Sequence, residues 1–313
     1  MDFRHLSNFV QIVDAGSLTR AAGMVGVAQP ALTFQIARLE QELECQLLIR
    51  STRGVYPTEA GMILYREAQS ILRHLQDVPQ LVRNPAIDPS GDVTIGFPNS
   101  LTPYFSTSVV AAVQEKLPRV RLRIFEGESV VQREQIMRNR VEVALICEHV
   151  PAADLHHRLL FKQRLAFLCD GRDSRDRDGD PIELVDAVGR ISGLPNVGNP
   201  VRAALDTATQ KLGLSIDVRV EYNAVRTLIS AVGRGLGASI NLWMPMQDVD
   251  DGQGIVTRPI IKPHIWLEVS LCRSKLHQPT PAAVRVEEIM AEVALDRISC
   301  ADWQGAVLQE SVG

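Results

Sequence analysis

Two tight breaks inside a strongly helical N-terminal stretch constrain the fold more than any other feature of the sequence. Residues 2–14 repeat apolar side chains at helical spacing. Gly16 can end this helix, and Ser17 can cap the next one by accepting a backbone N–H bond. Gly26 permits a second turn, and Pro30 then falls in the first turn of a third helix, where its missing N–H costs nothing. The sequence therefore predicts three short helices joined by tight turns.

The third helix carries both an apolar and a polar face. Its inward positions recur at intervals of four, three and four: Leu32, Ile36, Leu39 and Leu43. Thr33 and Gln35 lie off this stripe, near the N-terminal end. Two helices across a tight turn, with polar residues at the start of the second, form the helix-turn-helix that fits the DNA major groove. A plain helical hairpin has the same spacing, so spacing alone does not decide between the two.

The residues at and around these turns resemble the signature of the LysR-type transcriptional regulators. The matching segments are GSLTRAA at 16–22, VAQPALT at 27–33, LLIR at 47–50, RGV at 53–55 and PTEAG at 57–61. Within the family, AQP at 28–30, LIR at 48–50 and RGV at 53–55 most resemble the nitrogen-assimilation-control branch. The resemblance implies that residues 1–58 form an all-α-rich winged helix-turn-helix domain.

The resemblance also implies which residues contact DNA. The front of the third helix would enter the major groove, and the wing would reach the backbone or the minor groove. The implied contacts are Arg20, Gln29, Pro30, Thr33, Phe34, Gln35, Arg38, Arg50 and Arg53. Two positions depart from the family pattern. Ala28 replaces the usual Ser or Thr and loses a helix cap worth roughly 1 kcal/mol, and Phe34 can only pack on a thymine methyl.

A heptad pattern follows this domain. Apolar residues recur at intervals of four and three: Leu64, Ala68, Ile71, Leu75, Val78 and Val82. A single surface helix can show this pattern, but here it resembles the family's linker helix, which pairs with a second copy to form a dimer. Residues 59–90 are assigned to this helix and a hinge, and separate pairing of the sensor domains would give a tetramer. Pro79 is expected to kink or end the helix.

Short apolar runs alternate with helical patterns from residue 91 onward. The predicted strands are 93–97, 121–125, 141–147, 165–168, 217–221, 238–242 and 265–272, and the predicted helices are 101–117, 130–139, 202–212, 224–234 and 281–295. This alternation predicts a parallel sheet with helices on both faces. The Asp, Arg and Gly run at 170–180 is interpreted as a solvated loop. Residues 299–313 form a C-terminal tail without a structural signal.

The order of these elements is similar to the sensor domain of the same family, a two-lobed α/β domain like a periplasmic binding protein. The resemblance implies a regulatory domain at 91–298, with a first lobe of about 91–161 and 268–298 and a second lobe of about 162–267. Where strands end at helix N-termini, free N–H groups can bind a small ligand. The positions that align with ligand contacts are Ser100, Leu101, Thr102, Ser129, Cys147, Gly198, Asn199 and Asn223.

Two features of these positions qualify the expectation. Ser100, Ser129 and Asn223 can also be explained as caps of the helices that follow them. Cys147 stands where relatives that sense aromatic acids carry Arg, which argues against a strongly anionic effector.

Composition sets few further limits. The net charge of −4 argues mildly against a nucleic-acid partner, so the DNA assignment rests on the motif. The five cysteines are scattered without a Cys-x-x-Cys pair, which predicts free thiols and leaves a redox switch open. A signal region and a membrane-spanning apolar run are both missing, so we expect a cytoplasmic protein.

Three functions compete. A ligand-responsive regulator would have promoter DNA, a small-molecule effector, further copies of itself and RNA polymerase as partners. A solute-binding protein leaves residues 1–85 unexplained, and an enzyme lacks a nucleophile elbow, a phosphate loop or a zinc motif. We therefore expect no catalysis, cofactor or metal. Within the family, a regulator controlled by its abundance without an effector is the alternative.

Overall fold

The computed structural model describes residues 2–51, 54–83, 89–148, 153–172, 176–245, 254–300 and 303–308. The chain divides into two compact units, Met1–Ile87 and Asp88–Gly313. Within the described residues, no helix is long and apolar enough to cross a membrane.

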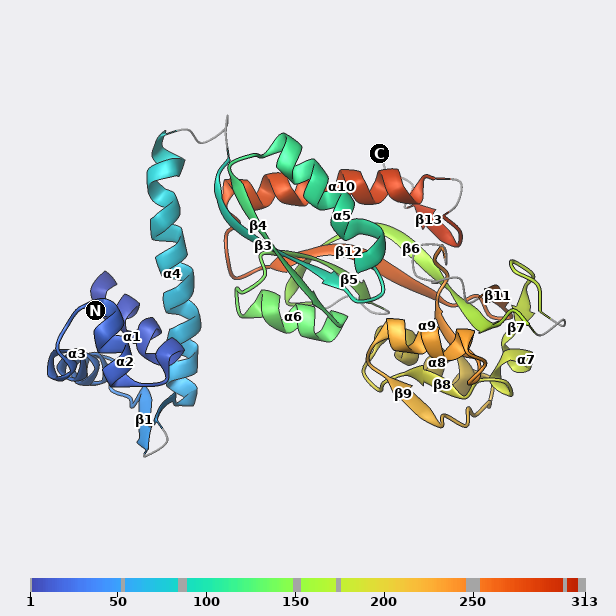
Figure 1. The fold of residues 1–313 in the computed structure, drawn as a ribbon, viewed down its shortest axis with the longest axis horizontal. Helices are drawn as coiled ribbons and strands as arrows, with labels where there is room; N and C mark the ends of the chain where they lie inside the picture. Colours follow the sequence, from blue (N-terminus) through green and yellow to red (C-terminus); the bar gives the residue numbers. More distant parts are fainter. Residues whose placement is uncertain are drawn as a thin grey trace. The chain divides into compact units, whose positions relative to one another are not determined.

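The first unit confirms the three predicted helices and their turns (Figure 1). Ser17 caps the second helix by accepting from the Arg20 amide at 3.4 Å, and Gly16 and Gly26 end their helices at φ values of 60° and 71°. Ala28 gives the third helix no side-chain cap. The elements are α1 (Phe3–Ala15), α2 (Leu18–Val25), α3 (Gln29–Glu42), the wing strands β1 (Leu48–Ser51) and β2 (Gly54–Pro57), and α4 (Glu59–Arg83).

Close backbone packing attaches the wing to the helices. The Val55 amide donates to the Gly16 carbonyl at 3.0 Å, and a Cβ at position 54 would lie 2.7 Å from that same oxygen. Gly54 is therefore required by the contact between wing and turn. Glu40 of α3 holds the start of β1, because its carboxylate accepts hydrogen bonds from the amides of Leu47 and Leu48 at 2.8 and 3.1 Å.

Leu43 departs from its expected position in the core of this unit, and one of the two expected effects of Pro79 is excluded. Leu43 is 37% exposed, because α3 ends at Glu42 and Leu43 forms its C-cap outside the core. Pro79 does not end α4, which continues to Arg83. A proline inside a helix removes one backbone donor and can kink the helix without ending it.

The second unit begins with a lobe built on parallel strands. β3 (Gly91–Pro98) lies between β4 (Val120–Gly127) and β5 (Val143–Glu148) and runs parallel to both. Helices α5 (Thr102–Lys116) and α10 (Pro281–Ile298) pack against one another on one face, and α6 (Ser129–Met137) covers the other (Figure 1). The predicted helices and strands of this lobe are confirmed.

Two strands join this lobe to the second one. β6 (Leu155–Asp170) pairs with β12 (Trp266–Ser274) up to Arg164 and then with β10 (Ser239–Leu242) and β11 (Ile255–Ile261). All these pairs are antiparallel, so the sheet is mixed and the expectation of a parallel sheet holds for only part of it, including β3, β4 and β5. β6 is also much longer than the predicted 165–168 strand, because it serves both lobes.

The second lobe contains further elements around α8 (Pro200–Lys211) and α9 (Val225–Gly233), both of which were predicted. β9 (Val220–Tyr222) pairs parallel with β8 (Gly193–Pro195). Sequence patterns missed β7 (Ile182–Glu183), α7 (Leu184–Val188), β8 and β11. The first three are too short to show a period, and β11 is interrupted by Arg258 and Pro259.

The C-terminal residues are not a featureless tail. β13 (Ala306–Leu308) pairs antiparallel with β6, and the indole of Trp303 is buried against Tyr104, Phe105 and Phe161. The Trp303 indole N–H donates to Gln163 Oε1 at 3.0 Å. The expectation failed because one tryptophan and three strand residues give no periodic pattern.

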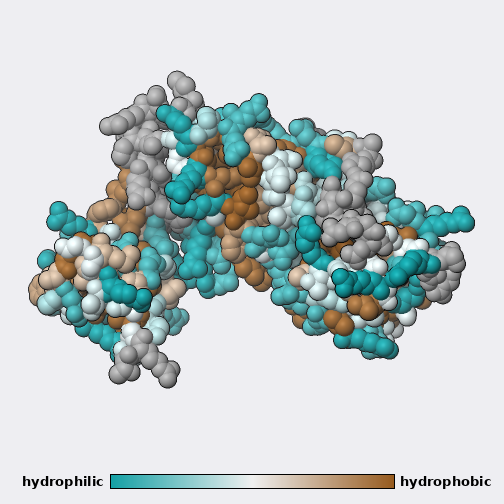
Figure 2. All heavy atoms as spheres, viewed as in Figure 1, coloured by the Kyte–Doolittle hydropathy of each residue, from teal (hydrophilic) through white to brown (hydrophobic). Residues whose placement is uncertain are grey.

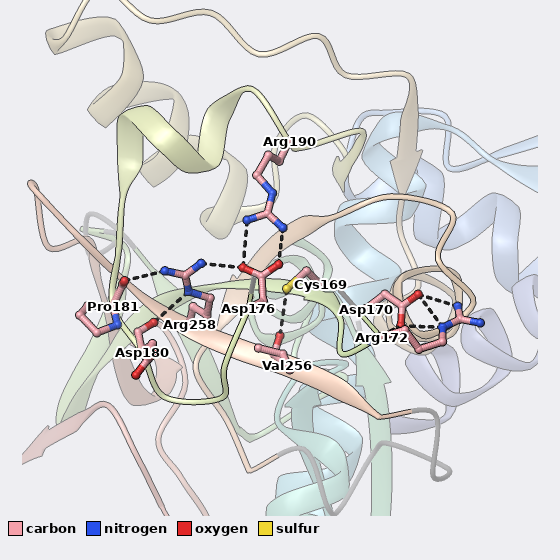
Figure 3. A network of polar contacts seen from close by, with 9 residues as sticks. All are labelled: Cys169, Asp170, Arg172, Asp176, Asp180, Pro181, Arg190, Val256 and Arg258. Atoms are coloured by element: carbon pink, nitrogen blue, oxygen red, sulfur yellow. Dashed lines mark hydrogen bonds and ion pairs between the residues drawn. The ribbon is translucent and has the colours of Figure 1, made fainter. Parts of the chain in front are cut away.

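The described residues of the run at 171–180 are exposed, as expected, with the exception of Asp176 (Figure 3). The Asp176 side chain is fully inaccessible and ion-paired with Arg190 and Arg258. Arg258 also donates to the carbonyls of Asp180 and Pro181 at 3.0 and 2.8 Å. Sequence could not identify this pairing because Arg190 and Arg258 lie 14 and 82 residues from Asp176 along the chain, beyond the reach of a local pattern.

Candidate DNA-binding and ligand-binding sites

The front of α3 presents a surface suited to DNA. Gln29, Pro30, Phe34 and Arg38 are exposed, and Phe34 is 70% exposed, a large fraction for a phenyl ring. Thr33 is half-buried. The opposite face holds Leu32, Ile36 and Leu39 in the core, so packing fixes the orientation of the polar face.

Arg20 and Arg50 are also exposed, on α2 and on the wing strand β1. Arg53 lies outside the described residues. Gln35 already has an intramolecular role, because its Oε1 accepts from Asn8 Nδ2 of α1 at 2.5 Å.

The predicted dimerisation seam divides into two parts along α4. Ala68 is fully buried and Leu64 packs against the core of its own unit. Ile71, Leu75 and Val78 are 41%, 46% and 45% exposed, a large apolar stripe at intervals of four and three. The side chain of Val82 lies outside the described part.

A cleft between the two lobes collects five of the eight predicted ligand positions. Ser100, Ser129 and Cys147 line it from the first lobe, and Asn199 and Asn223 line it from the second. Leu101, Thr102 and Gly198 are not among its lining residues. Leu101 is fully buried in the core, and the Thr102 hydroxyl donates to the Pro98 carbonyl at 3.1 Å. Sequence analysis missed other polar lining residues: Asn99, Glu128, Tyr222 and Asn241.

The capping interpretation is wrong for all three proposed caps. Leu101, Glu128 and Ala224 occupy the N-cap positions of α5, α6 and α9, and none makes a side-chain cap bond. The Ser129 hydroxyl instead accepts from the Cys147 amide at 3.1 Å. Asn199 does cap α8, accepting from the Val201 amide at 3.0 Å.

The cleft is closed in this structure. Its cavity measures about 30 Å³, room for one or two water molecules. Asn99 Nδ2 of the first lobe donates to the Asn223 carbonyl of the second at 3.4 Å, and the Tyr104 hydroxyl donates to the Pro245 carbonyl at 3.0 Å. A metabolite can therefore be held there only if the cleft widens.

Electrostatics make the cleft a poor site for an anion. Glu128 is the one charged side chain among the described residues that line it, and its Oε1 is buried without a hydrogen-bond partner. Burial raises the pKa of the Cys147 thiol to about 12, so it stays neutral. Asn241 Nδ2 is also buried without a partner. The cleft thus offers one unpaired acceptor and one unpaired donor.

The fold and these two sites define a two-part regulator, and comparison with known proteins identifies its family. Residues 3–62 match the family described as bacterial regulatory helix-turn-helix protein, lysR family, and residues 86–294 match the LysR substrate binding domain. The chain therefore belongs to the LysR family of transcriptional regulators.

Among its relatives, the chain is similar to the nitrogen assimilation regulatory protein nac of Escherichia coli strain K12. The two are 34% identical over 298 residues, 94% of this chain and 95% of the relative. The nac protein of Klebsiella aerogenes is 32% identical over 291 residues, 93% of this chain and 94% of the relative. The resemblance to the nitrogen-assimilation-control branch is thereby confirmed.

Solved structures share the fold. A full-length OxyR variant from Pseudomonas aeruginosa covers 99% of both chains at a TM-score of 0.74 and 20% identity. Full-length CbnR in complex with its target DNA covers 94% of this chain and all of its own, at a TM-score of 0.65 and 18% identity.

Proposed function

We propose that this LysR-type regulator binds promoter DNA through the front of α3 and the wing. The exposed face of Gln29, Thr33, Phe34 and Arg38 supports this most directly, because the core side chains on the opposite face hold it outward. Arg20, Arg50 and Arg53 would add phosphate contacts, and Pro30 and Gln35 would flank the base-contacting residues. The full-length CbnR structure contains target DNA on a similar fold, which supports the same use here.

A gel-shift with the promoter region upstream of the protein's own gene tests this proposal. We expect a retarded complex that survives excess nonspecific DNA, since specific binding is typically about 10³ or more tighter than nonspecific binding. Arg38→Glu should abolish the complex because it places a negative charge against phosphate. Arg119→Glu, the same charge change in the other unit, should leave it intact. A complex that excess nonspecific DNA removes would refute sequence-specific binding.

We also propose that the protein assembles through two surfaces, as a dimer of dimers. The exposed stripe Ile71, Leu75 and Val78 is one surface. Figure 2 shows hydrophobic residues gathered over the first lobe, where the edge strand β4 and α6 lie. Ile124 and Val130 are exposed on these elements. Contact with RNA polymerase and a cytoplasmic location complete the proposal, as expected of a transcriptional regulator.

We also propose that transcriptional regulation by this protein depends on a small effector bound between the lobes. Such a ligand would touch both lobes and shift their angle only if it bound one angle more tightly. Because Glu128 Oε1 lacks a partner and none of the described residues that line the cleft is cationic, the favoured effector is an uncharged or cationic molecule with an N–H donor. The alternative is that regulation depends on the abundance of the protein itself, without an effector. The closed cleft, with a cavity of about 30 Å³, favours this alternative.

A thermal-shift screen of small metabolites separates the two. Effector control predicts that some amine- or amide-bearing metabolite raises Tm, and that Ser100→Leu removes this shift while DNA affinity without ligand is kept. Ser100→Ala, which keeps the space, should preserve the shift. If no metabolite changes Tm and Ser100→Leu regulates like the parent, the cleft has no effector and abundance sets the output.

A further inference from the structure

A second cavity lies on the second lobe, at the far end of α8 from the inter-lobe cleft. Its volume is about 650 Å³. Small-molecule sites measure about 300–1,000 Å³, so this cavity can hold a metabolite, which the closed cleft cannot. One wall is the second half of α8 and the residue after it, and the other is the segment that joins β11 to β12. The lining residues are Ala204, Thr207, Ala208, Lys211, Leu212, Lys262, Pro263, His264, Ile265 and Trp266.

The walls combine apolar surface with positive charge. Ala204 and Ala208 are small and leave room, while Leu212, Ile265 and Trp266 provide apolar and aromatic surface. Lys211 is exposed and has no ion-pair partner among the described residues. The Lys262 ammonium already pairs with Glu183 at 2.6 Å. The Thr207 hydroxyl donates to the Ala203 carbonyl at 2.8 Å. Lys211 is therefore the group left to meet a ligand's charge.

We propose that this cavity binds a small aromatic carboxylate. The ring would lie against Trp266 and Leu212, and the carboxylate would meet Lys211. A flat apolar body is favoured because burying it removes apolar surface from water on both sides. An anion is favoured because none of the described residues that line the cavity is acidic. The charge of this site is opposite to that of the inter-lobe cleft, where Glu128 is the one charged side chain among the described lining residues.

The cavity borders the hinge between the lobes. Trp266 begins β12 opposite Arg164, the residue at which β6 leaves its pairing with β12. The Arg164 guanidinium lies 5.6 Å from the Trp266 ring centre and 5.7 Å from that of Trp243. The Leu165 amide donates to the Ile265 carbonyl at 3.0 Å. The two strands that join the lobes, β6 and β12, thus meet at the cavity wall. A ligand bound here would therefore favour one angle between the two lobes. That regulatory consequence rests on the proposed function, whereas the binding itself does not.

Isothermal titration calorimetry of the full chain with 1-naphthoate tests the site. The uncharged 1-naphthamide, which has the same ring without the charge, is the control ligand. We expect naphthoate to bind at least about tenfold more tightly than the amide, a difference of about 1.4 kcal/mol. Lys211→Glu should weaken the binding of naphthoate by at least about tenfold. Lys211→Arg keeps the positive charge and should retain the affinity of the parent. Arg234→Glu makes the same charge change at the end of α9, outside the cavity, and should have no effect.

Three results would overturn the proposal. They are no heat of binding at millimolar naphthoate, equal affinity in parent and Lys211→Glu, and loss of binding in Ser100→Leu, which would place the ligand in the inter-lobe cleft. The assay contains no DNA, so a failure here is distinct from a failure of promoter binding in the gel-shift.

Discussion

At the scale of single residues, one buried carboxylate organises part of the second lobe. The pKa of Asp176 lies well below its ordinary value because Arg190 and Arg258 hydrogen-bond to the carboxylate. The folded protein therefore binds this proton more weakly than the unfolded chain, in which the pKa is about 3.9. Its stabilising effect is complete above about pH 5 and is lost as the pH falls toward the folded-state pKa.

Replacing this carboxylate should expose that dependence. Asp176→Asn should lower the free energy of unfolding by about 3 kcal/mol at pH 7, because it leaves two guanidinium groups without a counter-charge. The difference between variant and parent should narrow below about pH 4. Denaturant unfolding at pH 7 and below about pH 4 measures this difference in the free energy of unfolding. Asp217→Asn is the control, since its partner Arg219 is exposed and the pair contributes at most about 1 kcal/mol. Equal costs at pH 7 would contradict the assignment.

The cysteines should differ in reactivity. Burial raises the pKa of both Cys147 and Cys169 to about 12, so almost no thiolate forms near neutral pH. Cys300 is exposed. A thiol reagent at pH 8 should label Cys300 in the native protein and the other two only after unfolding, as mass spectrometry of labelled peptides would show. If Cys147 in the native protein were labelled as fast as Cys300, this would contradict the expected protection and support the hypothesis of a redox switch.

At the scale of elements, the C-terminal segment fastens the strand that crosses between the lobes. Trp303→Ala should destabilise the second unit by about 3–5 kcal/mol, because it removes a buried indole and leaves Gln163 Oε1 without its donor. Urea unfolding measures this loss. Val307→Ala, at an exposed position of the same segment, should cost less than about 1 kcal/mol. Similar losses for the two variants would mean that the segment is not held in place.

The exposed stripe of α4 should hold two copies together. Ile71→Asp and Leu75→Asp would each bury an unpaired charge in a paired seam, so both should lower the mass measured by light scattering. Ile71→Leu keeps the apolar surface and should keep the mass. An unchanged mass in both Asp variants would exclude the seam.

At the scale of the whole molecule, local signals could be predicted and distant pairings could not. Gly16, Ser17 and Gly26 determine turns within a few residues, so the helix boundaries of the first unit follow from the sequence. The length of β6 and the partners of Asp176 depend on residues far along the chain. In the cleft, Ser100 and Ser129 could be placed because they align with the ligand-contact positions of the family. Leu101 could not, because a shift of one residue at a helix start turns its side chain into the core.

The most direct test of the central claim is the salt dependence of binding to the promoter, measured by fluorescence anisotropy. A phosphate contact by Arg50 predicts that Arg50→Ala weakens binding similarly on all sequences and reduces the slope of log affinity against log salt by about one. Arg53→Ala should behave alike, and Thr33→Ala should keep the slope but relax preference at one base pair. Parental slopes in both arginine variants, with only sequence preference lost, would contradict this account of how the protein binds DNA.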